Sequence, residues 1–140
     1  MKKSLTAILS LLLFCTVSFA QTDKKAAASS SEEPDFKFEV EEYNFGTVKE
    51  GDKVEYEFRF TNAGNEPLII SNVQSTCGCT VPDWPKEPIQ KGQTAGIKVI
   101  FNSAGKVGLQ NRPITIFSNG KTSPKVVHLK GNVEKTADKE

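Results

Sequence analysis

Short runs in which apolar and polar residues alternate dominate the sequence between residues 36 and 133. The clearest run covers residues 53–61, where charged or polar residues alternate with Val54, Tyr56, Phe58 and Phe60. A period of two predicts a β-strand with one buried face and one solvent-facing side. Further runs of this kind lie at 36–40, 43–45, 68–73, 97–101, 114–117 and 126–133. No window of helical length carries an apolar stripe at intervals of three and four, so we expect an all-β domain.

Turn-forming residues separate these runs. The segment 63–67 (AGNEP) combines residues that tolerate positive φ with a proline that cannot donate to a β-ladder, and Asn119 with Gly120 starts a later loop. About seven short strands in roughly a hundred residues favour an immunoglobulin-like antiparallel β-sandwich, with a small barrel as the alternative. The pattern predicts a core led by Tyr56, Phe58, Phe60, Phe101 and Ile116.

The first twenty residues have the features of a secretory signal peptide. Two lysines precede an apolar run over residues 5–17, and small residues at 18 and 20 precede the expected cleavage site after Ala20. This run is shorter than the stretch of about 20 apolar residues that a membrane-spanning helix needs. We therefore predict a signal peptide at 1–20, export to the periplasm or the extracellular space, and no transmembrane segment after cleavage.

Composition divides the remaining chain into three parts. Residues 21–34 are rich in Lys, Ala, Ser and Glu and contain no large apolar side chain, which predicts a flexible polar linker. We expect one domain over 35–134 and a polar tail over 135–140. Without Lys2 and Lys3, 16 basic residues stand against 17 acidic ones, a net charge of −1. This balance provides no basic surface for nucleic acid or for an anionic membrane.

The Cys-Gly-Cys segment at residues 77–79 holds the two cysteines that remain after signal-peptide removal. If residues 74–81 are extended, Cys77 and Cys79 face the same side and serve as small buried apolar residues. If Gly78 lets the chain turn, the two sulfurs can bond, as an even cysteine count in an oxidising compartment permits. A ring this small stabilises the fold by only about 1.5 kcal/mol through loop closure.

Thiol–disulfide exchange and metal binding are the chemical alternatives for Cys77 and Cys79. A strained bridge is easier to reduce, but a reactive thiolate needs a helix N-terminus or a nearby cation, and the nearest basic residue downstream is Lys86. A metal site needs more ligands than two thiolates. The single histidine, His128, is expected to face solvent, so we predict no metal and no cofactor.

A proline-rich loop follows the cysteines. Pro82, Pro85 and Pro88 recur at intervals of three, which matches the repeat of a polyproline II helix. Trp84 lies among them, and tryptophan is enriched at interface hot spots. The loop is therefore either an exposed interaction segment anchored by Trp84 or a stiff connection between sheets with Trp84 folded onto the core.

Three segments carry a resemblance to a known family: residues 45–52 (FGTVKEGD), 60–70 (FTNAGNEPLII) and 76–82 (TCGCTVP). Together they resemble an uncharacterised family of secreted bacterial proteins with a domain of unknown function and an immunoglobulin-like fold similar to hydin-type and major-sperm-protein-type domains. The resemblance covers residues 36–133 and implies fold and export, but no reaction. Two positions depart from the pattern. They are Asn44, in place of an acidic residue, and Pro113, which suggests that a strand begins there or lies at an edge.

The candidate chemistry favours a protein that binds rather than one that catalyses. A hydrolase acting through Ser or Cys needs a general base, and His128 alone does not supply a catalytic set. We expect a non-enzymatic binding or structural module of the cell envelope, whose partner is an unknown protein or envelope component. Contact would run along a free strand edge or through the loop at 82–88. The alternative is a small thiol–disulfide exchange protein that uses Cys77 and Cys79.

Overall fold

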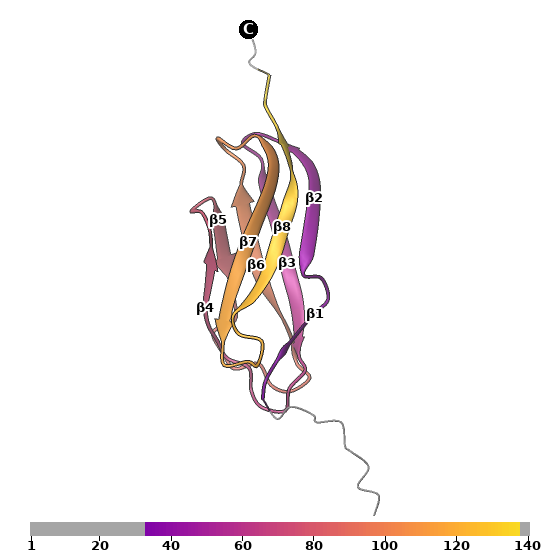
Figure 1. Ribbon diagram of the computed structural model, residues 1–140, viewed down its shortest axis with the longest axis vertical. Coiled ribbons are helices and arrows are strands. Elements are labelled where there is room, and N and C mark those ends of the chain that lie inside the picture. Colours follow the sequence, from indigo (N-terminus) through magenta and orange to yellow (C-terminus); the bar gives the residue numbers. More distant parts are fainter. Residues whose placement is uncertain (1–32, 138–140) are drawn as a thin grey trace, which may run out of the picture.

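The computed structural model describes residues 33–137, which contain eight strands and no helix. The strands are β1 (Phe36–Phe38), β2 (Glu42–Lys49), β3 (Lys53–Asn62), β4 (Ile70–Ser75), β5 (Thr80–Asp83), β6 (Thr94–Asn102), β7 (Gly108–Ser118) and β8 (Lys125–Glu134). They form two four-stranded sheets, in the orders β1-β3-β6-β5 and β2-β8-β7-β4, which pack face to face (Figure 1). The expected all-β sandwich is therefore confirmed.

Two features of the strand set differ from the expected pattern of about seven antiparallel strands. The chain has eight strands over the described residues, and β2 runs parallel to β8. The added strand β5 lies where prolines and cysteines hide the alternation. Pro82 fits into it because the Asn102 N–H donates to Cys79 O (2.8 Å), which leaves Pro82 at a position that does not donate to β6.

The two sheets enclose one apolar core. Four of the five residues expected to lead it are fully buried: Phe58, Phe60, Phe101 and Ile116. The fifth, Tyr56, is half-buried at the margin, where its ring stacks on Tyr43 with centroids 3.7 Å apart. Alternation along β3 and β6 thus predicts the core, and it loses accuracy only at the rim of the sandwich.

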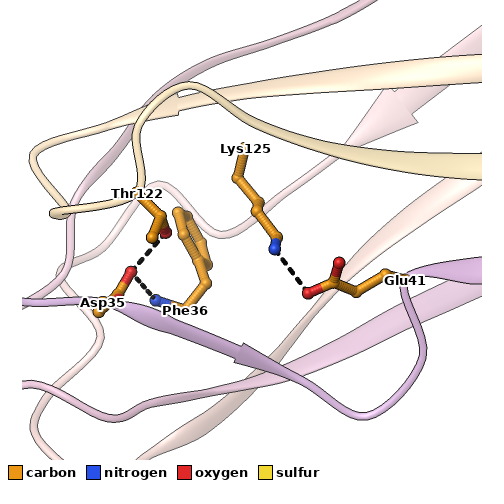
Figure 2. A network of polar contacts seen from close by, with 5 residues as sticks. All are labelled: Asp35, Phe36, Glu41, Thr122 and Lys125. Carbon is orange, nitrogen blue, oxygen red and sulfur yellow. Dashed lines mark hydrogen bonds and ion pairs between the residues drawn. The ribbon is translucent and has the colours of Figure 1, made fainter.

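The chain crosses from one sheet to the other directly after β1. Figure 2 shows the contacts that hold this crossing in place. Asp35 accepts hydrogen bonds from Thr122 Oγ1 (2.5 Å) and from the Phe36 N–H (2.9 Å), while Glu41 pairs with Lys125 Nζ (2.5 Å). Thr122 precedes β8 and Lys125 is its first residue. These contacts therefore tie the chain to β8 as it leaves the edge of β3 after Phe38 and continues beside β8.

Pro113 lies inside β7, so the prediction that a strand begins there is wrong. Its position is nevertheless edge-like on one side. The His128 N–H donates to Glu41 O (2.8 Å), which makes Pro113 and His128 a pair without mutual hydrogen bonds. The Pro113 nitrogen therefore points to the side of β7 where β4 has already ended at Ser75.

Several expectations concern parts of the chain outside residues 33–137. The signal peptide at 1–20, nearly all of the linker at 21–34 and the last three residues of the tail at 135–140 lie there, so these remain predictions. Over residues 33–137, no helix has the length and apolar character needed to cross a membrane.

Candidate functional site

The Cys-Gly-Cys segment forms the loop between β4 and β5, and a disulfide joins Cys77 to Cys79. Both cysteines are half-buried. The loop closes on itself through hydrogen bonds to backbone carbonyls: the single Ser75 hydroxyl hydrogen is shared between Cys77 O (2.9 Å) and Thr80 O (2.7 Å), and the Thr80 N–H donates to Cys77 O (3.3 Å). The loop therefore presents the bridge at one side of the sandwich, next to the edge strand β5.

A cation that sequence reasoning missed lies beside the bridge. Arg112, on β7, projects to the same face of its strand as buried Gln110 and Ile114. Its Nη1 lies 3.8 Å from Cys77 Sγ, and its Cζ lies 5.4 Å from the centroid of the Phe101 ring. The guanidinium thus sits between the sheets, with an aromatic face on one side and the disulfide on another.

The position of Arg112 is fixed by its neighbour Gln110. Gln110 is 8% exposed, and its amide nitrogen donates to Val107 O (3.3 Å) and Gly108 O (3.1 Å). Its amide oxygen accepts a hydrogen bond from Arg112 Nη2. The Arg112 Nε is buried and has no hydrogen-bond partner among the described residues. Partial burial removes some of the water that would solvate this guanidinium, which costs free energy. A negative charge that forms beside it is therefore stabilised.

The two sulfurs differ in their surroundings. Cys79 packs against the apolar core, whereas Cys77 faces Arg112. The hydroxyl of Thr80, which is 3% exposed, lies 4.0 Å from Cys77 Sγ and 3.9 Å from Cys79 Sγ, so it does not distinguish them. A bridge flanked by one cation and one apolar surface is chemically asymmetric.

A signal for Arg112 was present in the sequence. The run at 114–117 predicted a strand, and extending its alternation two residues backward places Arg112 on the same face as Ile114 and Ile116. Pro113 interrupted that extension. Proximity to Cys77 has no local signal, because 35 residues separate the two.

The proline-rich loop leaves β5 and packs along the sandwich. Trp84 is half-buried against the core, and Lys86 Nζ lies 3.0 Å above its ring. Pro82 belongs to β5, Pro85 is half-buried and Pro88 is exposed. The three prolines and Trp84 therefore do not form one continuous exposed surface, and the Trp84 ring is shared between the core and the Lys86 ammonium.

β3 is longer than the strand that pairs with its outer edge, since β1 pairs only with the last three residues of β3. The Glu39 N–H donates to Arg59 O (3.0 Å), so odd-numbered β3 residues direct their backbone groups to this edge. The N–H and C=O groups of Lys53, Glu55 and Glu57 therefore have no strand partner in the described part of the chain. We call residues 53–57 the free β3 edge.

A shallow hollow of about 340 Å³, lined by Glu55, Tyr56, Glu57 and Lys98, lies over β3 and its neighbouring strand β6. Lys98, on the neighbouring strand β6, pairs with Glu55 (3.2 Å), and both side chains are more than half exposed. On the inner side, the Tyr43–Tyr56 stack closes the gap between the sheets. The edge thus offers backbone groups between an outer face that carries Lys53 as well as Glu55 and Glu57 and an aromatic inner margin.

His128 lies on β8, on the outer face of the sheet β2-β8-β7-β4. Both cysteines lie in the loop between β4 and β5, and neither of these strands pairs with β8. The Nδ1 of His128 is 2.9 Å from Asn111 Oδ1, and His128 pairs in register with Glu42, whose carboxylate binds Lys130 Nζ (2.7 Å). Among residues 33–137, no cluster of three or more His, Cys, Asp or Glu side chains could hold a metal ion.

The Glu42–Lys130 pair has a testable pH dependence. The hydrogen bond from Lys130 and its charge lower the pKa of Glu42 below its ordinary value; desolvation opposes this, and the charge of His128 adds the least. A lowered folded-state pKa stabilises the fold above the unfolded pKa, and this contribution is lost as the pH falls through the folded value.

We expect Lys130→Met to raise the pKa of Glu42 toward its ordinary value and to flatten the acid end of the stability–pH curve. Carboxyl-carbon NMR titration of Glu42 measures this directly. Lys98→Met, which removes a cation paired with Glu55 instead, should leave the Glu42 titration unchanged. An equal shift in both variants would contradict the assignment to Lys130.

Comparison with known proteins places the domain. Residues 36–133 match the family described as "Protein of unknown function (DUF1573)", and no curated protein matches the chain. A protein of unknown function from Porphyromonas gingivalis W83 is similar in structure, with a TM-score of 0.63 and 14% identity over 76% of this chain and 50% of that one. The resemblance seen in the sequence is therefore confirmed.

Two further solved structures share the architecture. The ASH / PapD-like domain 7 of human CEP192 has a TM-score of 0.60 and 10% identity, covering 75% of this chain and 89% of that one. The secreted serine protease VesC from Vibrio cholerae has a TM-score of 0.54 and 14% identity, covering 74% of this chain and 23% of that one. Identities this low show the fold alone, and the PapD-like neighbour confirms the immunoglobulin-like sandwich. The chain spans half of the Porphyromonas protein and less than a quarter of VesC.

Proposed function

The chain belongs to the DUF1573 family, whose function is unknown, and we propose that its domain is an exported, non-enzymatic module that binds an extended segment of a partner protein along the free β3 edge. The observation that carries this proposal is the unpaired backbone at residues 53–57. An extended peptide adds to such an edge through main-chain hydrogen bonds, and its alternate side chains provide specificity.

The surroundings of the free β3 edge specify the chemistry of the partner segment. Side chains on the outer face of an added strand would lie beside Lys53, Glu55 and Glu57. Because Lys98 already pairs with Glu55, it is Glu57 that favours a Lys or Arg opposite it. Side chains on the inner face would meet the Tyr43–Tyr56 margin, which favours apolar residues. We therefore propose an extended segment of about four to five residues, with apolar side chains at alternate positions and a Lys or Arg opposite Glu57.

The edge strand β5 is a poorer site for strand addition. Its Thr80 N–H already donates to Cys77 O, its Thr80 C=O accepts from the Ser75 hydroxyl, and Pro82 has no N–H. Blocked edges of this kind protect sheets from unwanted pairing. Of the two contact modes expected from the sequence, these contacts favour a strand edge at β3 over the segment that begins at Pro82.

Glu55→Pro tests the binding mode. Proline at this position removes an edge N–H but no hydrogen bond between β3 and β6, so the variant should fold and lose binding to a synthetic peptide that alternates Lys and Val. Glu55→Gln keeps the N–H and should retain most of the binding. Isothermal titration gives the affinities, and thermal melts verify folding.

Amide hydrogen exchange provides an independent control. Without peptide, the amides of Lys53, Glu55 and Glu57 should exchange far faster than those of Val54 and Tyr56, and peptide should slow them selectively. Protection spread elsewhere on the domain, or equal binding by Glu55→Pro and wild type, would rule out strand addition at this edge.

Thiol–disulfide exchange is the second candidate, and the position of Arg112 supports it. Its Nη1, 3.8 Å from Cys77 Sγ, supplies the cation that the sequence did not reveal near the pair. Equilibrating the protein with glutathione buffers of graded potential tests this function. A pair that stays oxidised at potentials well below those of cellular thiol pools does not exchange, which would remove this candidate.

A further inference from the structure

We propose that Cys77 is the sulfur that exchanges with substrate thiols and disulfides, that Cys79 is the resolving sulfur, and that Arg112 is a positioning residue that holds Cys77 as a thiolate. This inference rests on the second candidate function and assigns a role to each residue of that site. It follows from the asymmetry of the bridge rather than from the presence of two cysteines.

The charge environment favours Cys77 as the thiolate. Its sulfur faces Arg112 Nη1 at 3.8 Å, and the neutral Thr80 hydroxyl lies 4.0 Å from it. A guanidinium close to a sulfur stabilises the charged form and lowers the thiol pKa. Cys79 packs against apolar core residues, which favours the protonated form.

Arg112 is well suited to this role because it is held before any charge forms. Gln110 fixes Nη2, the Phe101 ring lies 5.4 Å from Cζ, and the buried Nε has no partner among residues 33–137. A cation that is already partly desolvated and oriented loses less on meeting a thiolate than a free surface cation does, so more of the interaction appears as stabilisation of that thiolate. Arg112 does not contact the substrate and acts through Cys77.

The reaction balances as two exchanges. In the reduced protein, the Cys77 thiolate attacks one sulfur of a substrate disulfide, forms a mixed disulfide and releases the other substrate sulfur as a thiolate. Cys79 then loses its proton to solvent and attacks the Cys77 sulfur. The Cys77–Cys79 bond forms, the second substrate sulfur leaves as a thiolate, and two electrons have passed to the substrate. The reverse sequence oxidises a substrate dithiol.

Single-cysteine variants of the full chain, made in a Cys15→Ser background because the chain has three cysteines, test the assignment. Cys79→Ser isolates Cys77 and Cys77→Ser isolates Cys79, and the rate of iodoacetamide alkylation against pH reports each thiolate. We expect Cys77 to titrate at lower pH than Cys79 and to react with oxidised glutathione about tenfold faster at neutral pH. Arg112→Met in the Cys79→Ser background should move the Cys77 profile to higher pH, and Arg112→Lys should restore part of the shift.

Matched controls separate charge from packing. Met fills much of the space of Arg without its charge, so a merely structural role would make Met and Lys behave alike. Arg59→Gln, on an exposed strand face, should leave the Cys77 profile unchanged. Equal titration of the two thiols, or an unchanged profile in Arg112→Met, overturns the proposal. The single-cysteine thiols titrate without prior reduction, so this outcome is distinct from failure of the wild-type pair to exchange with glutathione.

Discussion

Replacing Asn62 by alanine is expected to lower the free energy of unfolding by about 3 kcal/mol, as measured by urea denaturation. Asn62 is 1% exposed, and its side chain joins the turn that follows β3 to the distant Ile89. Its Nδ2 donates to Glu66 O (2.8 Å) and Ile89 O (2.9 Å), and its Oδ1 accepts from the Gly64 N–H (3.0 Å). Alanine leaves these backbone groups without their partner, and each buried unpaired group costs about 1–3 kcal/mol.

Asn65→Ala is the matched control for this prediction. Asn65 lies in the same turn and is half-buried, but its side chain makes no hydrogen bond to another residue of the described range 33–137. Its replacement should change stability by less than about 0.5 kcal/mol. If both variants lost a similar free energy of unfolding, the Asn62 hydrogen bonds would contribute no more to stability than the Asn65 side chain does, and the prediction would be wrong.

Asn62 also shows where sequence reasoning reached its limit. The alternation along 53–61 predicts the buried face of β3, because period-two patterning depends only on local neighbours. Asn62 ends this strand on the same face as the buried residues Phe58 and Phe60, so a polar side chain occupies a position that the pattern assigns to an apolar one. The contacts with Glu66 and Ile89 explain it, and the Ile89 contact spans 27 residues.

The candidate sites were predictable in part for the same reason. The Cys77 and Cys79 pair and the idea of a free strand edge follow from local sequence and from the presence of a sheet. Which edge is free depends on the crossing from β1 to β2, which Glu41 and Lys125 hold from distant positions in the chain. The cation beside Cys77 comes from β7, so both sites depend on long-range pairing that periodicity does not encode.

Gly131→Ala is expected to destabilise the domain by about 2 kcal/mol, because the added Cβ would lie under 3.0 Å from atoms of the Phe45 ring. Phe45 is half-buried, packs on the core and tilts against Phe101, with centroids 5.8 Å apart, so its ring has an aromatic neighbour behind it. Gly78→Ala is the matched control and should be nearly neutral, because no heavy atom lies within 4 Å of the position that its methyl group would take.

A double-mutant cycle identifies the Phe45 ring as the cause of the Gly131→Ala effect. Phe45→Ala is itself destabilising because it removes a packed ring, yet it clears the space that the new methyl group on β8 needs. The cost of Gly131→Ala should therefore fall by about 1–2 kcal/mol in the Phe45→Ala background, measured by thermal or urea unfolding of all four proteins. An undiminished cost would place the strain in the β8 backbone instead, because only contact with the ring is relieved when the ring is removed.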